Sequence, residues 1–284
     1  MCAPGGFDST IDKWRSASAW TGINAVDALA AEHTIILYDR RECGQSSGRI
    51  ERLSWASYAR QGKALLDHLK IQSAWIMGGC MGCSVALAFG VHYPEATRGL
   101  LLHWPVGGYR WKINSRARFT RHYNFTKQNG LPAAVDRARG GKSFWMDSRG
   151  GPWATEIARN HAFAESFASQ DPERYLELFS PVGAALFDRD TAPGAEPGEE
   201  VVGVKAPALI IPGDDPSHAT SGAHYLRELL PKSDFGTSCR RHKRHRKCVI
   251  GCWSFVASSS RFQHNLRRVS YGPGKRNLIG IFHQ

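Results

Sequence analysis

No aspartate or glutamate follows Asp234 in this chain of 284 residues. The last 49 residues hold 11 of the 37 lysines and arginines and none of the 25 acidic residues, so nearly all of the formal net charge of +12 lies in this tail. A charge confined to one end does not give the rest of the chain a basic surface for nucleic acid. We therefore expect no nucleic-acid partner, despite the basic tail.

Long hydrophobic runs are also missing. No apolar stretch approaches the ~20 residues of a membrane span, and the start, MCAPGG, lacks the charged and then apolar pattern of a signal peptide. The seven cysteines are odd in number and unevenly spread, which argues against a disulfide framework. These absences indicate a cytoplasmic protein that makes no contact with a membrane.

Four short apolar runs end in charged or glycine-rich loops, as buried parallel strands do. They are HTIILYDRR (33–41), SAWIMGGC (73–80), RGLLLHWPVGG (98–108) and APALIIPGDD (206–215). Helical patterns lie between them, at 54–69 with Ser54 as N-cap and at 81–93, ended by Pro94. The alternation predicts an α/β fold with a mostly parallel central sheet flanked by helices.

The sequence also predicts how the chain divides. Residues 109–203 contain helical patterns without strand-like runs and end in a linker rich in proline, glycine and acid, DRDTAPGAEPGEEVVG (188–203). We expect a hydrophobic core formed by 1–108 and 204–235, with 109–203 inserted as a helical cap. Residues 236–284 are expected to form a basic tail that is aberrant or disordered.

The most informative stretch is GGCMGC (78–83). Cys80 follows a buried strand and precedes a helix, with Gly78 and Gly82 two positions to either side. This G-x-C-x-G pattern matches a nucleophile elbow with cysteine in place of serine. Small neighbours let strand and helix approach in a strained turn, and the helix N-terminus favours a thiolate and a developing oxyanion. We therefore predict that Cys80 is a nucleophile.

A C-x-x-C pair can also be a redox or metal site. Thioredoxin-like folds do not require glycines on both sides of the first cysteine, and a zinc site needs further ligands. The other closely spaced cysteines, Cys239, Cys248 and Cys252, lie in the tail. The elbow is therefore favoured, and Cys83 is interpreted as a packing residue one turn into the helix.

Three stretches together resemble a known family. They are YDRRECGQSS (38–47), MGGCMGCSVALAFGVHYPE (77–95) and LIIPGDDPSH (209–218). In this order they resemble the α/β-hydrolase superfamily, and within it the proline-iminopeptidase-like branch, over residues 4–235. That branch has serine where this chain has Cys80, whereas dienelactone-hydrolase-like members of the superfamily use cysteine. Asp39 corresponds to the family's structural D-x-R turn.

The resemblance implies further site residues. The oxyanion would be held by the backbone N–H groups of Met81 and of Gly6, which lies in the loop PGGFDST (4–10). Asp215 would be the acid that orients a catalytic histidine. His218, three residues later, is interpreted as a loop or packing histidine.

The histidine base is harder to place. In the family it follows the last strand, and this window holds His242 and His245 within CRRHKRHRKC (239–248). Such charges do not suit a buried strand. Within the tail, only VIGCWSFV (249–256) is apolar enough to form one, and His264 would follow it. The tail is either a basic arm for phosphate-rich partners or an aberrant end that replaces the native one, and its composition favours the second.

We predict a hydrolase that acts on an ester, amide or lactone of a small molecule and that needs no cofactor. The alternative is a catalytically inactive hydrolase fragment, or a basic binding protein on a hydrolase scaffold. A histidine close to both Cys80 and Asp215 in space would separate these possibilities. The sequence leaves the substrate and the oligomeric state open.

Overall fold

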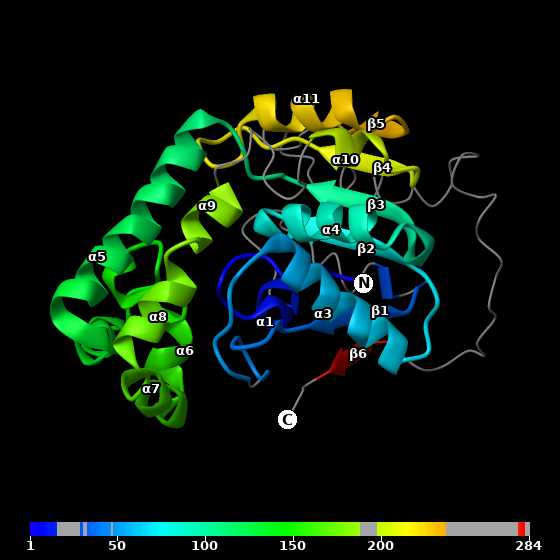
Figure 1. The fold of residues 1–284 in the computed structure, drawn as a ribbon. Helices are drawn as coiled ribbons and strands as arrows, with labels where there is room; N and C mark the ends of the chain where they lie inside the picture. Colours follow the sequence, from blue (N-terminus) through cyan, green and yellow to red (C-terminus); the bar gives the residue numbers. More distant parts are fainter. Residues whose placement is uncertain (16–28, 31–32, 47, 188–197, 237–277, 282–284) are drawn as a thin grey trace.

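A parallel β-sheet forms the centre of the molecule (Figure 1). The structure, a computed structural model, describes residues 1–15, 29–30, 33–46, 48–187, 198–236 and 278–281. Four strands pair in the order β2 (Ala74–Gly79), β3 (Thr97–His103), β4 (Ala208–Ile211) and β5 (Ser233–Phe235), all parallel. The predicted α/β fold with a parallel sheet is confirmed.

The N-terminal residues join this sheet to a second parallel pair. Strand β1 (Ile35–Tyr38) pairs with β6 (Leu278–Ile281). Cys2 makes parallel bridges to Leu37 of β1 and to Met77 of β2, so the first residues lie between these strands. The first loop therefore emerges next to the carboxyl end of β2.

The four predicted strands lie where the apolar runs place them, but two further strands were not predicted. Strand β5 has the sequence SDF, which carries no apolar run. The expectation that 249–256 is the only strand-forming stretch of the tail was wrong, because the short apolar run LIGI forms β6. Residues 249–256 themselves lie outside the described residues.

Helices cover both faces of the sheet. Helix α3 (Trp55–His68) begins at the predicted N-cap Ser54, which forms a capping box with Ser57. Helix α4 (Met81–His92) follows β2, is apolar on nearly all sides and ends before Pro94, which opens the short helix η1 (Pro94–Ala96). These helices and α11 (Thr220–Leu229) pack on one face, and α1 (Thr10–Arg15) packs on the other.

A helical segment connects β3 to β4 and lies to one side of the sheet (Figure 1). Its helices are α5 (Tyr109–Arg139), η2 (Ser148–Gly150), α6 (Ala154–Arg159), α7 (His161–Ala168), α8 (Pro172–Phe179) and α9 (Val182–Phe187). Helix α10 (Gly198–Val202), which precedes β4, lies back against α11 and α4. Stacked and edge-on rings form its interior, among them Phe119, Phe144, Tyr175, Phe179 and Phe187. The division at 108, 203 and 235 stays a prediction.

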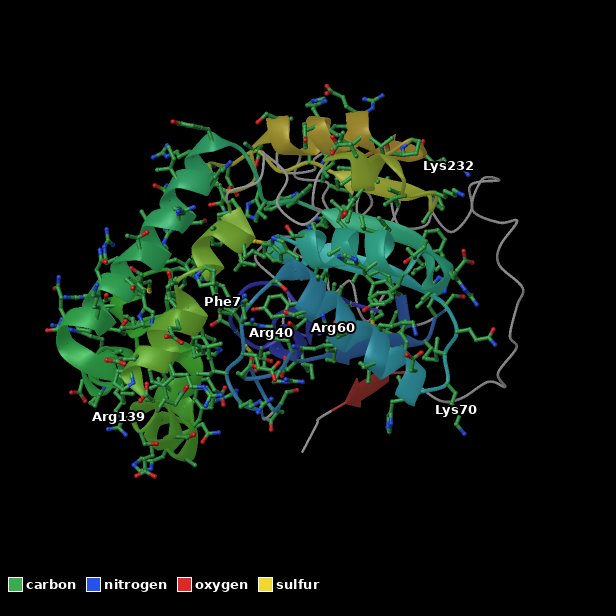
Figure 2. The ribbon with its side chains drawn as sticks, in the orientation of Figure 1. Phe7, Arg40, Arg60, Lys70, Arg139 and Lys232 are labelled. Carbon is green, nitrogen blue, oxygen red and sulfur yellow. The ribbon has the colours of Figure 1, made fainter. Side chains whose placement is uncertain are left out.

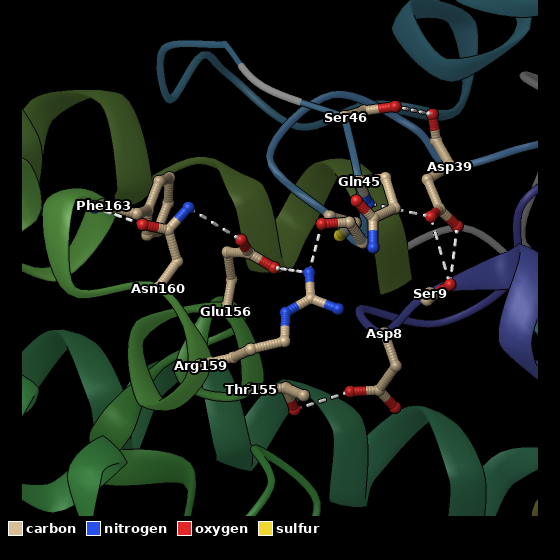
Figure 3. A network of polar contacts seen from close by, with 12 residues as sticks. Asp8, Ser9, Asp39, Gln45, Ser46, Thr155, Glu156, Arg159, Asn160 and Phe163 are labelled. Atoms are coloured by element: carbon tan, nitrogen blue, oxygen red, sulfur yellow. Dashed lines mark hydrogen bonds and ion pairs between the residues drawn. The ribbon is translucent and has the colours of Figure 1, made fainter. Parts of the chain in front are cut away.

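Polar contacts tie this segment to the first loop and to the turn after β1 (Figure 3). The Thr155 hydroxyl donates to Asp8 across 2.6 Å. Arg159 donates to the carbonyl of Gly44 and is paired with Glu156. Helix α6 is therefore attached to two loops at the carboxyl edge of the sheet.

The described part of the chain contains no helix long and apolar enough to cross a membrane. Apart from the buried Arg40, the basic side chains labelled in Figure 2 lie on different elements: Arg60 on α3, Lys70 after it, Arg139 at the end of α5 and Lys232 before β5. They are exposed and far apart from one another, so these four do not make one basic face.

Candidate active site

Cys80 occupies a strained turn between β2 and α4. Its backbone has φ 56° and ψ −124°, in a region that residues with a Cβ atom rarely adopt. Its N–H donates to the His103 carbonyl of the neighbouring strand across 3.1 Å, which holds the turn in place. A Cβ atom on Gly78 would lie 2.1 Å from the Gly82 oxygen, so the predicted small residues are required for strand and helix to approach. The turn has the backbone geometry that the motif predicts.

The glycine loop before α1 packs directly against this turn. A Cβ atom on Gly5 would lie 2.7 Å from the Gly79 oxygen and 2.9 Å from the Gly82 nitrogen. Gly6 has φ 74°, a conformation that favours glycine. Met81 is the first residue of α4, and the first N–H groups of a helix have no acceptor within it. The two predicted oxyanion donors therefore belong to segments in contact.

Cys83 has a structural environment. Its thiol donates to the carbonyls of Gly78 and His103, at 3.2 and 3.3 Å, and it is 2% exposed. Burial raises the pKa of this thiol well above its ordinary value. Cys80 and Cys83 are not joined by a disulfide. A buried thiol that is hard to ionise is a poor partner in dithiol exchange, so the geometry favours the packing interpretation.

Asp215 follows β4 and closes a tight turn. Its carboxylate accepts hydrogen bonds from the backbone N–H groups of Ser217 and His218, at 2.8 and 3.0 Å. The His218 ring also lies 2.9 Å from both carboxylate oxygens through Nδ1. Burial opposes ionisation of Asp215, but the hydrogen bonds from His218 and Ser217 outweigh it and lower the pKa of the carboxyl group.

His218 is more than a loop histidine. It is only 8% exposed, and its ring lies 5.9 Å from that of Trp104, the residue that follows β3. Burial, and then the electrostatic interaction with the neighbouring His218, lowers the pKa of His103 to about 4. The packing that sequence analysis expected is present, but the bond to Asp215 was missed. The D-x-x-H spacing within one turn is the signal that could have suggested it.

The other candidate bases, His242, His245 and His264, lie outside the described residues. Within the described part of the chain, no group of three or more His, Cys, Asp or Glu side chains is arranged to hold a metal ion. The described candidates are thus Cys80 and Asp215, with Gly6 and Met81 beside the elbow.

The fold and this strained turn place the chain in a known family. Residues 1–148, more than half of the chain, match the model of the alpha/beta hydrolase fold. The protein belongs to this family. A solved variant of the meta-cleavage product hydrolase CumD from Pseudomonas fluorescens IP01 has a TM-score of 0.52 and 18% identity, with 90% of this chain and 89% of that chain covered. At this identity the likeness shows the fold alone.

Curated relatives match shorter segments. The chain is 31% identical over 77 residues to a protein of Azorhizobium caulinodans named as carbamate hydrolase RutD, with 27% of this chain and 29% of the relative covered. It is 29% identical over 102 residues to the dihydrolipoyllysine-residue acetyltransferase component of the acetoin cleaving system of Cupriavidus necator, with 36% of this chain and 25% of the relative covered. The chain thus aligns with less than a third of the length of either relative.

Proposed function

We propose that this protein hydrolyses an ester, amide or lactone of a small molecule through Cys80 as the nucleophile. The observation that carries the proposal is the backbone of Cys80 at φ 56°, between a strand and a helix and against the glycine loop. Strain of this kind persists where the surrounding structure imposes it, and it is concentrated at functional sites.

The chemistry follows from the position of the turn. A thiolate at the start of α4 would be favoured by the helix dipole. When it attacks a carbonyl carbon, the carbonyl oxygen becomes negatively charged, and the N–H groups of Met81 and Gly6 would donate to it. A thioester would form and would then be hydrolysed by water. Asp215 would orient the base that moves the protons.

The substrate class rests on relatives and on the nucleophile. One curated relative is named as a carbamate hydrolase, and carbamates, like esters and lactones, present a carbonyl to a nucleophile. The proline-iminopeptidase-like resemblance also suggests amides. The helical segment is proposed as a cap that selects among these substrates, because α6 contacts the first loop, whose Gly5 packs against the elbow.

The proposal is tested with Cys80→Ala on a panel of small chromogenic esters, amides and lactones. We expect Cys80→Ala to abolish hydrolysis and Cys80→Ser to keep a part of it, since the fold also operates with serine. An alkylating agent, followed by peptide mapping, should label Cys80 faster than buried Cys43.

Cys83→Ala is the matched control, because this buried thiol lies in the first turn of α4, which directly follows Cys80. Its hydrogen bonds go to the main-chain carbonyls of Gly78 and His103. It should stay within a few-fold of the parent in hydrolysis. Full activity of Cys80→Ala would overturn the proposal. An equal loss in both variants, accompanied by disulfide reductase activity, would support a redox function instead.

A further inference from the structure

We infer that His218 is the general base of this site and that it is held in place by Asp215, three residues before it in the same turn. This inference rests on the proposed function, since it assigns the proton acceptor that Cys80 requires. It differs from the family arrangement, in which the histidine follows the last strand of the sheet.

The first argument is the pairing of imidazole and carboxylate. His218 Nδ1 lies 2.9 Å from both oxygens of Asp215, so the carboxylate fixes which ring nitrogen carries the proton. Nε2 is then the nitrogen with the lone pair that can accept a proton. A carboxylate on Nδ1 orients the ring and stabilises the imidazolium that forms during the reaction.

The second argument is the place of this pair in the sheet. Strands β2, β3 and β4 are neighbours, and their carboxyl ends carry Cys80, Trp104 and the Asp215 turn. The N–H of Cys80 donates to the carbonyl of His103, and the next ring along the chain, Trp104, lies 5.9 Å from that of His218. The Gly107 N–H also donates to the carbonyl of Ser217, which fastens the turn to the segment after β3. His218 and Cys80 therefore flank the same strand end.

The third argument concerns the other candidate histidines. Asp215 already accepts two backbone N–H groups and the His218 ring. For His242 or His245 to take the place of His218 at this carboxylate, the bond to His218 would have to break and its buried ring would have to move. Retaining the existing pair requires no such rearrangement.

The proton steps balance. The Cys80 thiol gives its proton to His218 Nε2 as the sulfur bonds to the carbonyl carbon, and the carbonyl oxygen takes the electron pair. When the tetrahedral intermediate collapses, the bond to the leaving group breaks and His218 protonates that group. His218 then takes a proton from water as water attacks the thioester, and returns it to the departing sulfur.

The test uses the full chain and alkylation of Cys80 by iodoacetamide, followed by peptide mapping from pH 5 to pH 9. The titratable groups next to His218 are Asp215 on the same turn and His103 on β3. We expect His218→Asn to lower the alkylation rate of Cys80 at pH 7 about tenfold. The pH dependence of this rate should then be that of an ordinary thiol, with a pKa of about 8.5. Hydrolysis should fall by about 10²–10⁴-fold.

His218→Asn separates a base from a packing residue. Its amide N–H can take the place of Nδ1 and keep the bond to Asp215, but it has no nitrogen that accepts a proton. An unchanged thermal midpoint with lost hydrolysis is the expected result. Free imidazole should restore hydrolysis in His218→Ala at least in part. His92→Gln is the matched control, because His92 is exposed at the far end of α4.

Two results would overturn the inference. One is an unchanged alkylation profile and unchanged hydrolysis in His218→Asn. The other is a loss of hydrolysis confined to His242→Gln, His245→Gln or His264→Gln. Because alkylation needs no turnover, it reports on the Cys80–His218 pair even if no substrate is found. Full hydrolysis by Cys80→Ala would instead reject the proposed function itself.

Discussion

Two aspartates at the ends of parallel strands illustrate two uses of the same side chain. Asp39 follows β1 and is 3% exposed. It accepts from the Ser9 hydroxyl and from the backbone N–H groups of Thr10, Ile11 and Gln45, at 2.6 to 3.1 Å. Asp215 follows β4 and its side chain is 24% exposed. It accepts from its own turn and from an imidazole ring.

The partners of each carboxylate determine what it can do. None of these hydroxyl and backbone donors to Asp39 changes its charge near neutral pH, so this residue fixes the first loop against the turn 39–46. The donor on Asp215 is a histidine, which can gain and lose a proton in this range. Asp39 therefore has a structural role, and Asp215 has the partner that the proposed chemistry needs.

Among the variants that test this comparison of the two aspartates, Asp215→Asn should have the largest effect. An amide at this position can hold the turn but cannot stabilise an imidazolium, so we expect kcat/KM to fall about 10³–10⁴-fold. The free energy of unfolding should change by less than about 1 kcal/mol, because the carboxylate is partly exposed and the turn keeps an acceptor. Asp214→Asn, at the exposed neighbouring position, is the control. An equal loss in both variants would mean that the turn, not the carboxylate of Asp215, matters.

Asp39→Asn should have the opposite effect, with a large loss of stability and little loss of activity. Several charge-assisted hydrogen bonds would be weakened in a buried turn, so we expect unfolding to require about 3 kcal/mol less free energy. A Cβ atom on Gly44 would also lie 1.7 Å from the carboxylate, so the side chain has no room to move toward that residue. Urea denaturation measures this change. Activity per folded molecule should stay near that of the parent, and a stable but inactive variant would contradict the distinction.

The sequence predicted the regular elements well, because each depends on local signals. Apolar runs placed strands β1 to β4, Ser54 marked the start of α3, and Pro94 marked the end of α4. Strand β5 was missed because SDF has no apolar pattern and pairs only through its backbone with β4. The elbow was also predictable, since Gly78 and Gly82 are needed to avoid contacts below 3.0 Å.

The rest of the site depends on contacts that local sequence does not encode. That Gly5 packs on the elbow follows from the placement of the first residues between β1 and β2. The bond between Asp215 and His218 depends on how the turn is held by Gly107 and Trp104, on a segment a hundred residues earlier in the chain. The sequence showed both residues but not that the ring turns toward the carboxylate.

The smallest expected effect concerns how the two aspartate turns respond to pH. Glu42 lies in the Asp39 turn and is 3% exposed; burial, against the attraction of Arg40, raises its pKa from 4.5 to about 7. The folded protein thus binds this proton more tightly than the unfolded chain. Stability from this group is fully present below pH 4.5 and is lost as the pH rises to about 7. The contribution of Asp215 to stability depends on pH in the opposite direction. Because the pKa of its carboxyl group is lowered in the folded protein, this contribution disappears as the pH falls below the ordinary pKa of 3.8.

Glu42→Gln should remove the loss of stability between pH 4.5 and about 7, because the amide does not ionise. The free energy of unfolding of the parent, relative to the variant, should decrease by about 2 kcal/mol between pH 5 and pH 8. Urea denaturation at both pH values gives this difference, in which the contributions of other titrating groups cancel. Glu51→Gln is the control, since this partly exposed carboxylate pairs with Arg41 at the surface. A parent and variant that differ by the same amount at both pH values would show that Glu42 is ionised in the folded protein throughout the range, and would contradict this prediction.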